Sequence, residues 1–120
     1  MMAFFYVFLG GGLGSMARLG IAQMTSNTAL LFPWSTFIAN ISSCFILGVL
    51  IGLRLRGDLS QSAQFFLITG FCGGFSTFST FSLENLQLLQ EGRLAALAIY
   101  TGLSMLLGLA ALIVGIRIAG

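Results

Sequence analysis

Charge is scarce in this sequence of 120 residues. Lysine and histidine are absent, and the charged residues, 7% of the chain, are five arginines and three acids. An ordinary soluble domain is about a quarter charged, so these few charges cannot solvate the surface of a soluble fold. The net charge of +2 provides neither the basic stripe of a nucleic-acid-binding protein nor a polybasic arm for a membrane surface. With 58% hydrophobic residues and a mean hydropathy of +1.04, the chain is predicted to lie within a lipid bilayer.

The residue types that most enzymes use are also scarce. With no histidine, three acids and two separated cysteines, the sequence offers no metal-ligand cluster and no Ser/His/Asp constellation. No glycine-rich phosphate motif lies between a strand and a helix. Cys44 and Cys72 each fall within an apolar stretch and are predicted to be buried, inert thiols. No enzymatic activity is therefore predicted.

Long uncharged stretches separate the few charges. A helix needs about 20 apolar residues to cross a bilayer, and we predict four such spans at residues 3–24, 33–54, 62–90 and 94–117. Segments this long and continuously apolar favour helices over a β-barrel. The first is expected to be a retained span, not a signal peptide, because no basic region precedes it. A polar connection at residues 23–28 and two other short loops indicate an all-α membrane protein, with one four-helix transmembrane domain over residues 1–120.

The arginines decide how such a chain is oriented, because basic residues favour the cytoplasmic side. With four helices, one face carries Arg54, Arg56 and Arg117, and the other carries Arg18 and Arg93. A bias of three against two favours insertion in both orientations, which would permit an antiparallel, dual-topology homodimer with a two-fold axis in the membrane plane. The alternative is a fixed topology set by Arg54 and Arg56.

The third span is too long for one regular helix perpendicular to the membrane. A helix over residues 62–90 would be about 43 Å long, whereas the hydrocarbon core is about 30 Å thick. Gly73 and Gly74 lie at its centre, before a run of alternating phenylalanine and hydroxyl residues. Glycine and the hydroxyl residues both disfavour helix. We expect a break near residues 73–79, which at membrane depth would mark a functional site. A tilted, unbroken helix is the alternative.

Phe75, Phe78 and Phe81 recur every three residues between the hydroxyls of this run. Such a pattern is usually packing or lipid contact, but the edge of an aromatic ring is electropositive. Ring edges beside hydroxyls could coordinate a small, hard anion without a full positive charge that would hold it too tightly.

Small and polar residues also share helix faces in the other spans. The spacing GxxxG predicts close helix contacts at Gly10/Gly14, Gly48/Gly52 and Gly70/Gly74. Thr36, Asn40 and Ser43 fall on one face of the second span, and Tyr100, Ser104 and Gly108 on one face of the fourth. Each face is ordinarily a site of interhelical hydrogen bonds, but two of them beside a broken helix favour a polar track.

In these residues the chain resembles the Fluc (CrcB) family of fluoride channels along nearly its whole length. The most specific match is the run Gly73 to Ser82 followed by Glu84, and the glycine-rich first span with Arg18 also matches, as do Thr36 to Asn40 and Tyr100 with Ser104. The resemblance implies an antiparallel dimer of four-helix subunits, with two fluoride pores at the subunit interface and a structural sodium ion (Na+) on the two-fold axis. It also implies a multi-pass protein of the bacterial inner membrane that exports fluoride passively and reduces its toxicity.

The resemblance also implies roles for individual residues. Phe78 and Phe81 would turn their ring edges toward fluoride, and Asn40 would donate a hydrogen bond in the pore. The backbone carbonyls of Gly73 and Ser76 would hold sodium. The polar track would consist of Thr36, Ser79, Thr80, Tyr100 and Ser104.

The resemblance also implies roles for two charged residues: Arg18 would lie near a vestibule, and Glu84 would couple to the exit region. The sequence departs from the family pattern at two positions. The family often has threonine where Ser76 stands, which matters little for a backbone ligand. It commonly has serine where Gly108 stands, which leaves the far end of the polar track open.

Two other functional classes fit the same hydropathy. A small dual-topology, proton-coupled multidrug exporter also has four spans, but it needs a membrane-embedded carboxylate, typically in the first span. Residues 1–25 contain none, so Glu84 would have to serve. A non-transporting helical subunit of a larger complex would give no ion flux and would not need the run of hydroxyl and phenylalanine residues.

Overall fold

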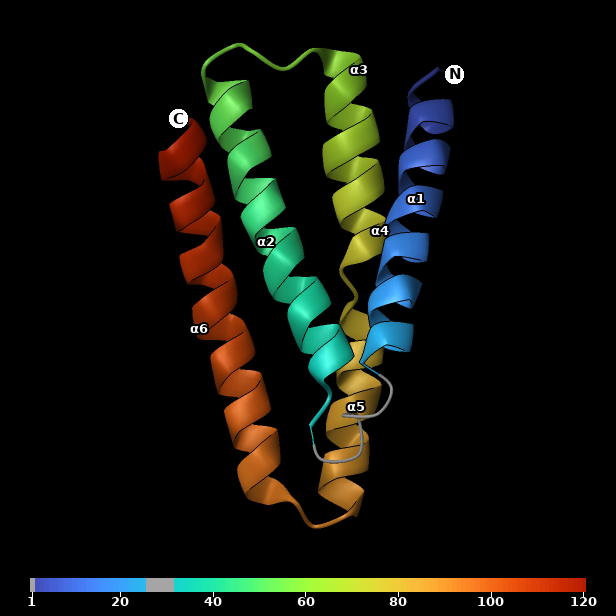
Figure 1. Ribbon diagram of the computed structural model, residues 1–120, viewed down its shortest axis with the longest axis vertical. Coiled ribbons are helices and arrows are strands. Elements are labelled where there is room, and N and C mark those ends of the chain that lie inside the picture. The colour runs from blue at the N-terminus through green and yellow to red at the C-terminus, as the bar shows by residue number, and fades with distance from the viewer. Residues whose placement is uncertain (1, 26–31) are drawn as a thin grey trace.

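The computed structural model describes residues 2–25 and 32–120 (Figure 1). Residues 26–28, part of the polar connection expected at 23–28, lie outside the described residues. The prediction of four spans is confirmed, because among the described residues four helical segments are long and apolar enough to cross a membrane: Met2–Met24, Trp34–Leu55, Gln61–Gln90 and Leu94–Ala119. The elements are α1 (Met2–Met24), α2 (Trp34–Leu55), α3 (Gln61–Ala63), η2 (Gln64–Cys72), α4 (Gly73–Phe75), α5 (Phe78–Gln90) and α6 (Leu94–Ala119).

Two tight turns connect these helices at opposite ends of the molecule (Figure 1). After α2, Gly57 has a positive φ of 79°, and the amide of Asp58 donates to the carbonyl of Leu53. After α5, Gly92 has a φ of 73°, and the amide of Arg93 donates to the carbonyl of Leu88. Glycine is favoured here because other residues rarely adopt this left-handed conformation. Both turns therefore end a helix with the same backbone motif.

Backbone contacts through glycine bring the helices together in pairs. In the pair of α2 and α6, a Cβ atom at Gly115 would lie 2.5 Å from the carbonyl oxygen of Phe45 and 2.8 Å from the amide of Val49. In the pair of α1 with η2 and α4, a Cβ at Gly70 would lie 3.0 Å from the Cα of Gly10. Each glycine of the three GxxxG spacings faces the backbone of a neighbouring helix, which confirms the close contacts that the spacing predicts.

The third span is not one regular helix. Residues Gln64–Cys72 form a π-helix, a conformation that is rare and that is found mostly as single turns, frequently at functional sites. One turn later the helix stops: Ser76 (φ −89°, ψ 156°) and Thr77 (φ −151°, ψ 125°) are both extended. Helix α5 begins at the next residue, and the Thr77 hydroxyl caps it by accepting a hydrogen bond from the amide of Thr80.

The glycine contacts of α1 predict a sharp difference between two alanine substitutions. A Cβ at Gly14 would collide with the carbonyl oxygen of Phe71 and approach the amide of Phe75 to 2.8 Å, whereas a Cβ at Gly12 would meet nothing within 4 Å. Gly14→Ala should lower the free energy of unfolding by about 1–3 kcal/mol, because packed backbone must move apart. Gly12→Ala should leave it unchanged or raise it by up to about 1 kcal/mol. Thermal unfolding of both variants in detergent tests this, and equal losses would contradict the packing described.

Candidate functional site

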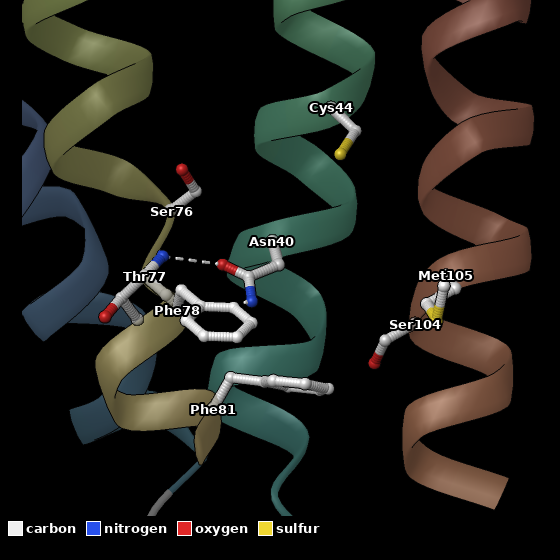
Figure 2. Close-up of a pocket in the computed structure, with 8 residues that line it drawn as sticks. All are labelled: Asn40, Cys44, Ser76, Thr77, Phe78, Phe81, Ser104 and Met105. Atoms are coloured by element: carbon white, nitrogen blue, oxygen red, sulfur yellow. Dashed lines mark hydrogen bonds between the residues drawn. The ribbon is translucent and has the colours of Figure 1, made fainter. Parts of the chain in front are cut away.

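The extended residues between α4 and α5 are held by a side chain of α2. The Asn40 amide pairs with both backbone groups of Thr77: the Thr77 N–H donates to Asn40 Oδ1 at 2.9 Å, and Asn40 Nδ2 donates to the Thr77 carbonyl at 3.3 Å. Figure 2 shows the amide of Asn40 directed at Thr77 across the gap between the two segments. A helix break frees backbone groups that need new hydrogen-bond partners. Asn40 supplies an acceptor and a donor to two of these groups.

Other side chains satisfy carbonyls in the last turn before the interruption, at Cys72 and Gly74. The carbonyl of Cys72 accepts from the hydroxyl of Ser43 (3.3 Å), the hydroxyl of Ser76 (2.9 Å) and the amide of Ser76 (3.1 Å). Arg18 of α1 donates from Nε to the carbonyl of Gly74 at 3.3 Å. Helices α1 and α2 thus hold the interruption from two sides.

A cavity of about 300 Å³ opens beside the interruption. Its lining residues are Asn40, Cys44, Ser76, Thr77, Phe78, Phe81, Ser104 and Met105. The ring centroids of Phe78 and Phe81 lie 6.0 Å apart, and in Figure 2 both rings project from α5 toward this cavity. The Ser104 hydroxyl oxygen of α6 is buried and has no hydrogen-bond partner within residues 2–25 and 32–120. Every lining residue is uncharged, so the cavity offers ring edges, an amide and hydroxyls as its polar groups.

A second cavity, of about 570 Å³, contains the two charged residues singled out in the sequence, Arg18 and Glu84. Thr36 and Thr80 also line it. The Glu84 carboxylate accepts hydrogen bonds on both oxygens, from the Thr36 hydroxyl at 3.0 Å and from the Tyr100 hydroxyl at 2.8 Å. Tyr100 is fully buried and its ring centroid lies 4.9 Å from that of Phe81. Tyr100 therefore touches a carboxylate that lines the second cavity and a ring that lines the first.

The residues expected in a polar track are divided between the two cavities: Thr36 and Thr80 line the second and Ser104 lines the first, while Tyr100 lies between them. Ser79 is exposed and lines neither cavity, and its hydroxyl lies 3.2 Å from that of Thr77. Gly73 and Ser76, the expected sodium ligands, line a third cavity of about 220 Å³ together with Cys72. The grouping of the expected residues into a pore stays a prediction.

Sequence reasoning missed three residues that line the first cavity: Cys44, Thr77 and Met105. The prediction that Cys44 is buried is wrong, because its side chain is only half-buried, whereas the burial expected for Cys72 is confirmed. The position of Cys44 one helical turn after Asn40 could have indicated this, since residues four apart share a helix face. Thr77 lies in the region expected to break, but nothing in its residue type predicts the contact with Asn40.

Comparison with known proteins identifies the family. A family model described as "CrcB-like protein, Camphor Resistance (CrcB)" matches residues 5–116. The chain belongs to the CrcB family. The resemblance found in its sequence is therefore confirmed at the level of the family.

Curated CrcB relatives are similar over nearly the full length. A protein of Flavobacterium psychrophilum is 44% identical over 121 residues, which cover 99% of this chain and 98% of the relative. One of Azobacteroides pseudotrichonymphae is 42% identical over 113 residues, covering 92% and 90%. One of Thermus thermophilus is 40% identical over 121 residues, covering 100% and 97%. Each of these relatives is named a fluoride-specific ion channel FluC.

The hydrogen bond between Tyr100 and Glu84 is predicted to contribute measurably to the free energy of unfolding. Tyr100→Phe should lower the free energy of unfolding by about 1–3 kcal/mol, because it leaves an acceptor on a partly buried carboxylate unsatisfied. Tyr6→Phe makes the same chemical change in α1, outside both cavities, and should have no comparable effect. Thermal unfolding in detergent compares the two, and an equal shift for both variants would show that the hydrogen bond at 2.8 Å adds nothing to stability.

Proposed function

We propose that this protein is a fluoride-selective ion channel of the bacterial inner membrane, which lets fluoride leave the cytoplasm down its electrochemical gradient. The observation that carries the proposal is the cavity beside the interrupted helix. It combines the rings of Phe78 and Phe81, the amide of Asn40 and the buried hydroxyl of Ser104. The FluC names of full-length CrcB relatives support fluoride as the ion.

The chemistry of this cavity suits a small, hard anion that must also move on. Conduction requires binding that is favourable enough for entry and weak enough for exit. Ring edges carry only partial positive charge, and amide and hydroxyl donors are neutral, so no lining residue holds the anion with a full opposite charge. The ion needs no chemical change, so the proposed activity is that of a channel and not of an enzyme.

The second cavity provides the rest of the proposed route. Arg18 supplies positive charge that raises the local concentration of anions, and Glu84 in the same cavity holds the hydroxyls of Thr36 and Tyr100. The hydroxyls of Thr36, Thr80 and Tyr100 are proposed to continue the route from the second cavity to Ser104 in the first, where Tyr100 also contacts the ring of Phe81. Ser79 is proposed to join this track when the pore is complete.

The complete pore is proposed to need two chains in antiparallel orientation, which form two pores. The ring of Phe78 is 78% exposed in the single chain, so the cavity it lines needs a second subunit to enclose it. The near-even distribution of arginines supports a dual topology.

The proposed dimer holds a sodium ion at the backbone carbonyls of Gly73 and Ser76. The residues present fit such an ion, because hard cations take oxygen ligands and unwound backbone carbonyls supply them. The Thr77 amide, which would donate to the Gly73 carbonyl in a regular helix, donates to Asn40 instead. When bound, the ion would compensate the partial negative charge of these carbonyl oxygens.

A proton-coupled multidrug exporter remains a weaker candidate. Its antiport needs an acid that alternates between proton and drug, and helix α1 contains no acid. Glu84 is the remaining acid at membrane depth, but both its oxygens are hydrogen-bonded to hydroxyls of other helices. These contacts suit a carboxylate in a fixed position better than one that receives large cationic drugs.

Fluoride flux is the direct test of the channel. Proteoliposomes containing the pure protein should release fluoride, recorded with a fluoride-selective electrode, and should release little chloride. Phe78→Ile or Phe81→Ile should slow the release by at least about tenfold, which corresponds to the loss of about 1.4 kcal/mol of ion stabilisation. Phe8→Ile on the exposed face of α1 is the matched control and should conduct normally. Equal chloride and fluoride release, or full activity in both pore variants, would refute the mechanism.

Orientation can be tested separately from flux. In a background with Cys44→Ser and Cys72→Ser, a single cysteine at Ser62 should react with an impermeant maleimide in about half of the molecules in sealed inner-membrane vesicles, as dual topology requires. A cysteine at Glu91, at the opposite end, should give the complementary half. Labelling of nearly all molecules at one position and none at the other would establish a fixed topology.

A further inference from the structure

We propose that pairing with the backbone of Thr77 fixes the orientation of the Asn40 amide, so that the cavity faces its N–H group and never its oxygen. The proposal rests on the anion-conducting function above and deepens it. It concerns how the polar groups of the cavity are held, not which groups are present.

The backbone of Thr77 makes the amide orientation unambiguous. A backbone N–H can only donate and a carbonyl can only accept, so the Thr77 N–H requires Oδ1 and the Thr77 carbonyl requires Nδ2. The observed distances of 2.9 Å and 3.3 Å satisfy both requirements at once. If the amide were rotated by half a turn, donor would face donor and acceptor would face acceptor, and both hydrogen bonds would be lost.

The pairing exists because the helix is interrupted. Thr77 is extended (φ −151°, ψ 125°), so its N–H and carbonyl point away from the helix axis instead of into a helical hydrogen-bond ladder. Lipid cannot satisfy these groups. Asn40 does so from α2, while the Thr77 hydroxyl caps α5, and the two roles together hold Phe78 at the start of α5.

The consequence for an anion concerns the second hydrogen of Nδ2. One hydrogen of this nitrogen is engaged by the Thr77 carbonyl, and Asn40 lines the cavity with Phe78 and Phe81. A freely rotating asparagine would present its oxygen for part of the time and repel an anion. The pairing removes that state, so the donor is oriented before the ion arrives and no reorganisation is needed.

Two substitutions separate the positioning role from the donor role. Asn40→Asp keeps an oxygen that can accept from the Thr77 N–H but has no N–H to offer. Its Thr77 amide should exchange with solvent as slowly as in the unaltered protein, while fluoride release falls at least about a hundredfold. Asn40→Ala removes both groups. Its Thr77 amide should exchange at least about tenfold faster, and fluoride release should fall as well.

The measurements are amide hydrogen exchange by NMR on full-length protein with isotopically labelled threonine, and fluoride release from proteoliposomes. Asn85→Ala is the matched control, because it removes another interhelical asparagine contact, the 3.3 Å hydrogen bond from Thr101, away from the cavity. It should change neither Thr77 exchange nor fluoride release.

Each outcome decides a separate point. Unchanged Thr77 exchange in Asn40→Ala would overturn the pairing, and fluoride release at the normal rate by Asn40→Asp would overturn the inference that an N–H must face the anion. If Asn40→Ala does not fold, Asn40→Asp still tests both points: faster Thr77 exchange would overturn the pairing through the side-chain oxygen, and normal fluoride release would overturn the need for an N–H. If the unaltered protein releases no fluoride, the proposed function fails, while the exchange measurements still judge the pairing.

Discussion

The rest of the structure depends on one constraint: backbone groups freed inside a bilayer must find partners within the protein, because lipid offers none. Two extended residues, Ser76 and Thr77, interrupt the third span. Their neighbours on α1 and α2 supply an asparagine amide, a serine hydroxyl and an arginine guanidinium to the groups around them. The positions of Asn40, Ser43 and Arg18 are therefore explained first by the interruption, and the availability of Asn40 to an anion follows from where it must lie.

Glycine makes this arrangement possible. Gly10, Gly14 and Arg18 follow one another at intervals of four on α1, so they share a helix face. The two glycines let α1 approach the backbone of η2 and α4, and one turn further on Arg18 reaches the carbonyl of Gly74. The close contact and the long side chain are thus parts of one interface. Helix α2 instead serves two partners: its Gly48 packs on α6, while Asn40, two turns earlier, reaches Thr77 of the third span.

Much of this was predictable from the sequence, for identifiable reasons. Uncharged stretches located all four spans, because charge is costly in lipid, and the paired glycines and hydroxyls pointed to the region that contains Ser76 and Thr77. The π-helix at Gln64–Cys72 was not predictable, since hydropathy is the same for either hydrogen-bond register. The half-exposure of Cys44 and the exposure of Ser79 depend on how α2, α5 and α6 are rotated against one another. The residue pattern of a single helix carries no information about that rotation.

The turns at Gly57 and Gly92 lie at opposite ends of the molecule (Figure 1) and close with the same set of backbone hydrogen bonds. Each turn also carries an arginine beside an acid, in the pairs Arg56–Asp58 and Arg93–Glu91. Moving either turn through a membrane therefore transfers a similar amount of polar backbone and a nearly neutral pair of side chains.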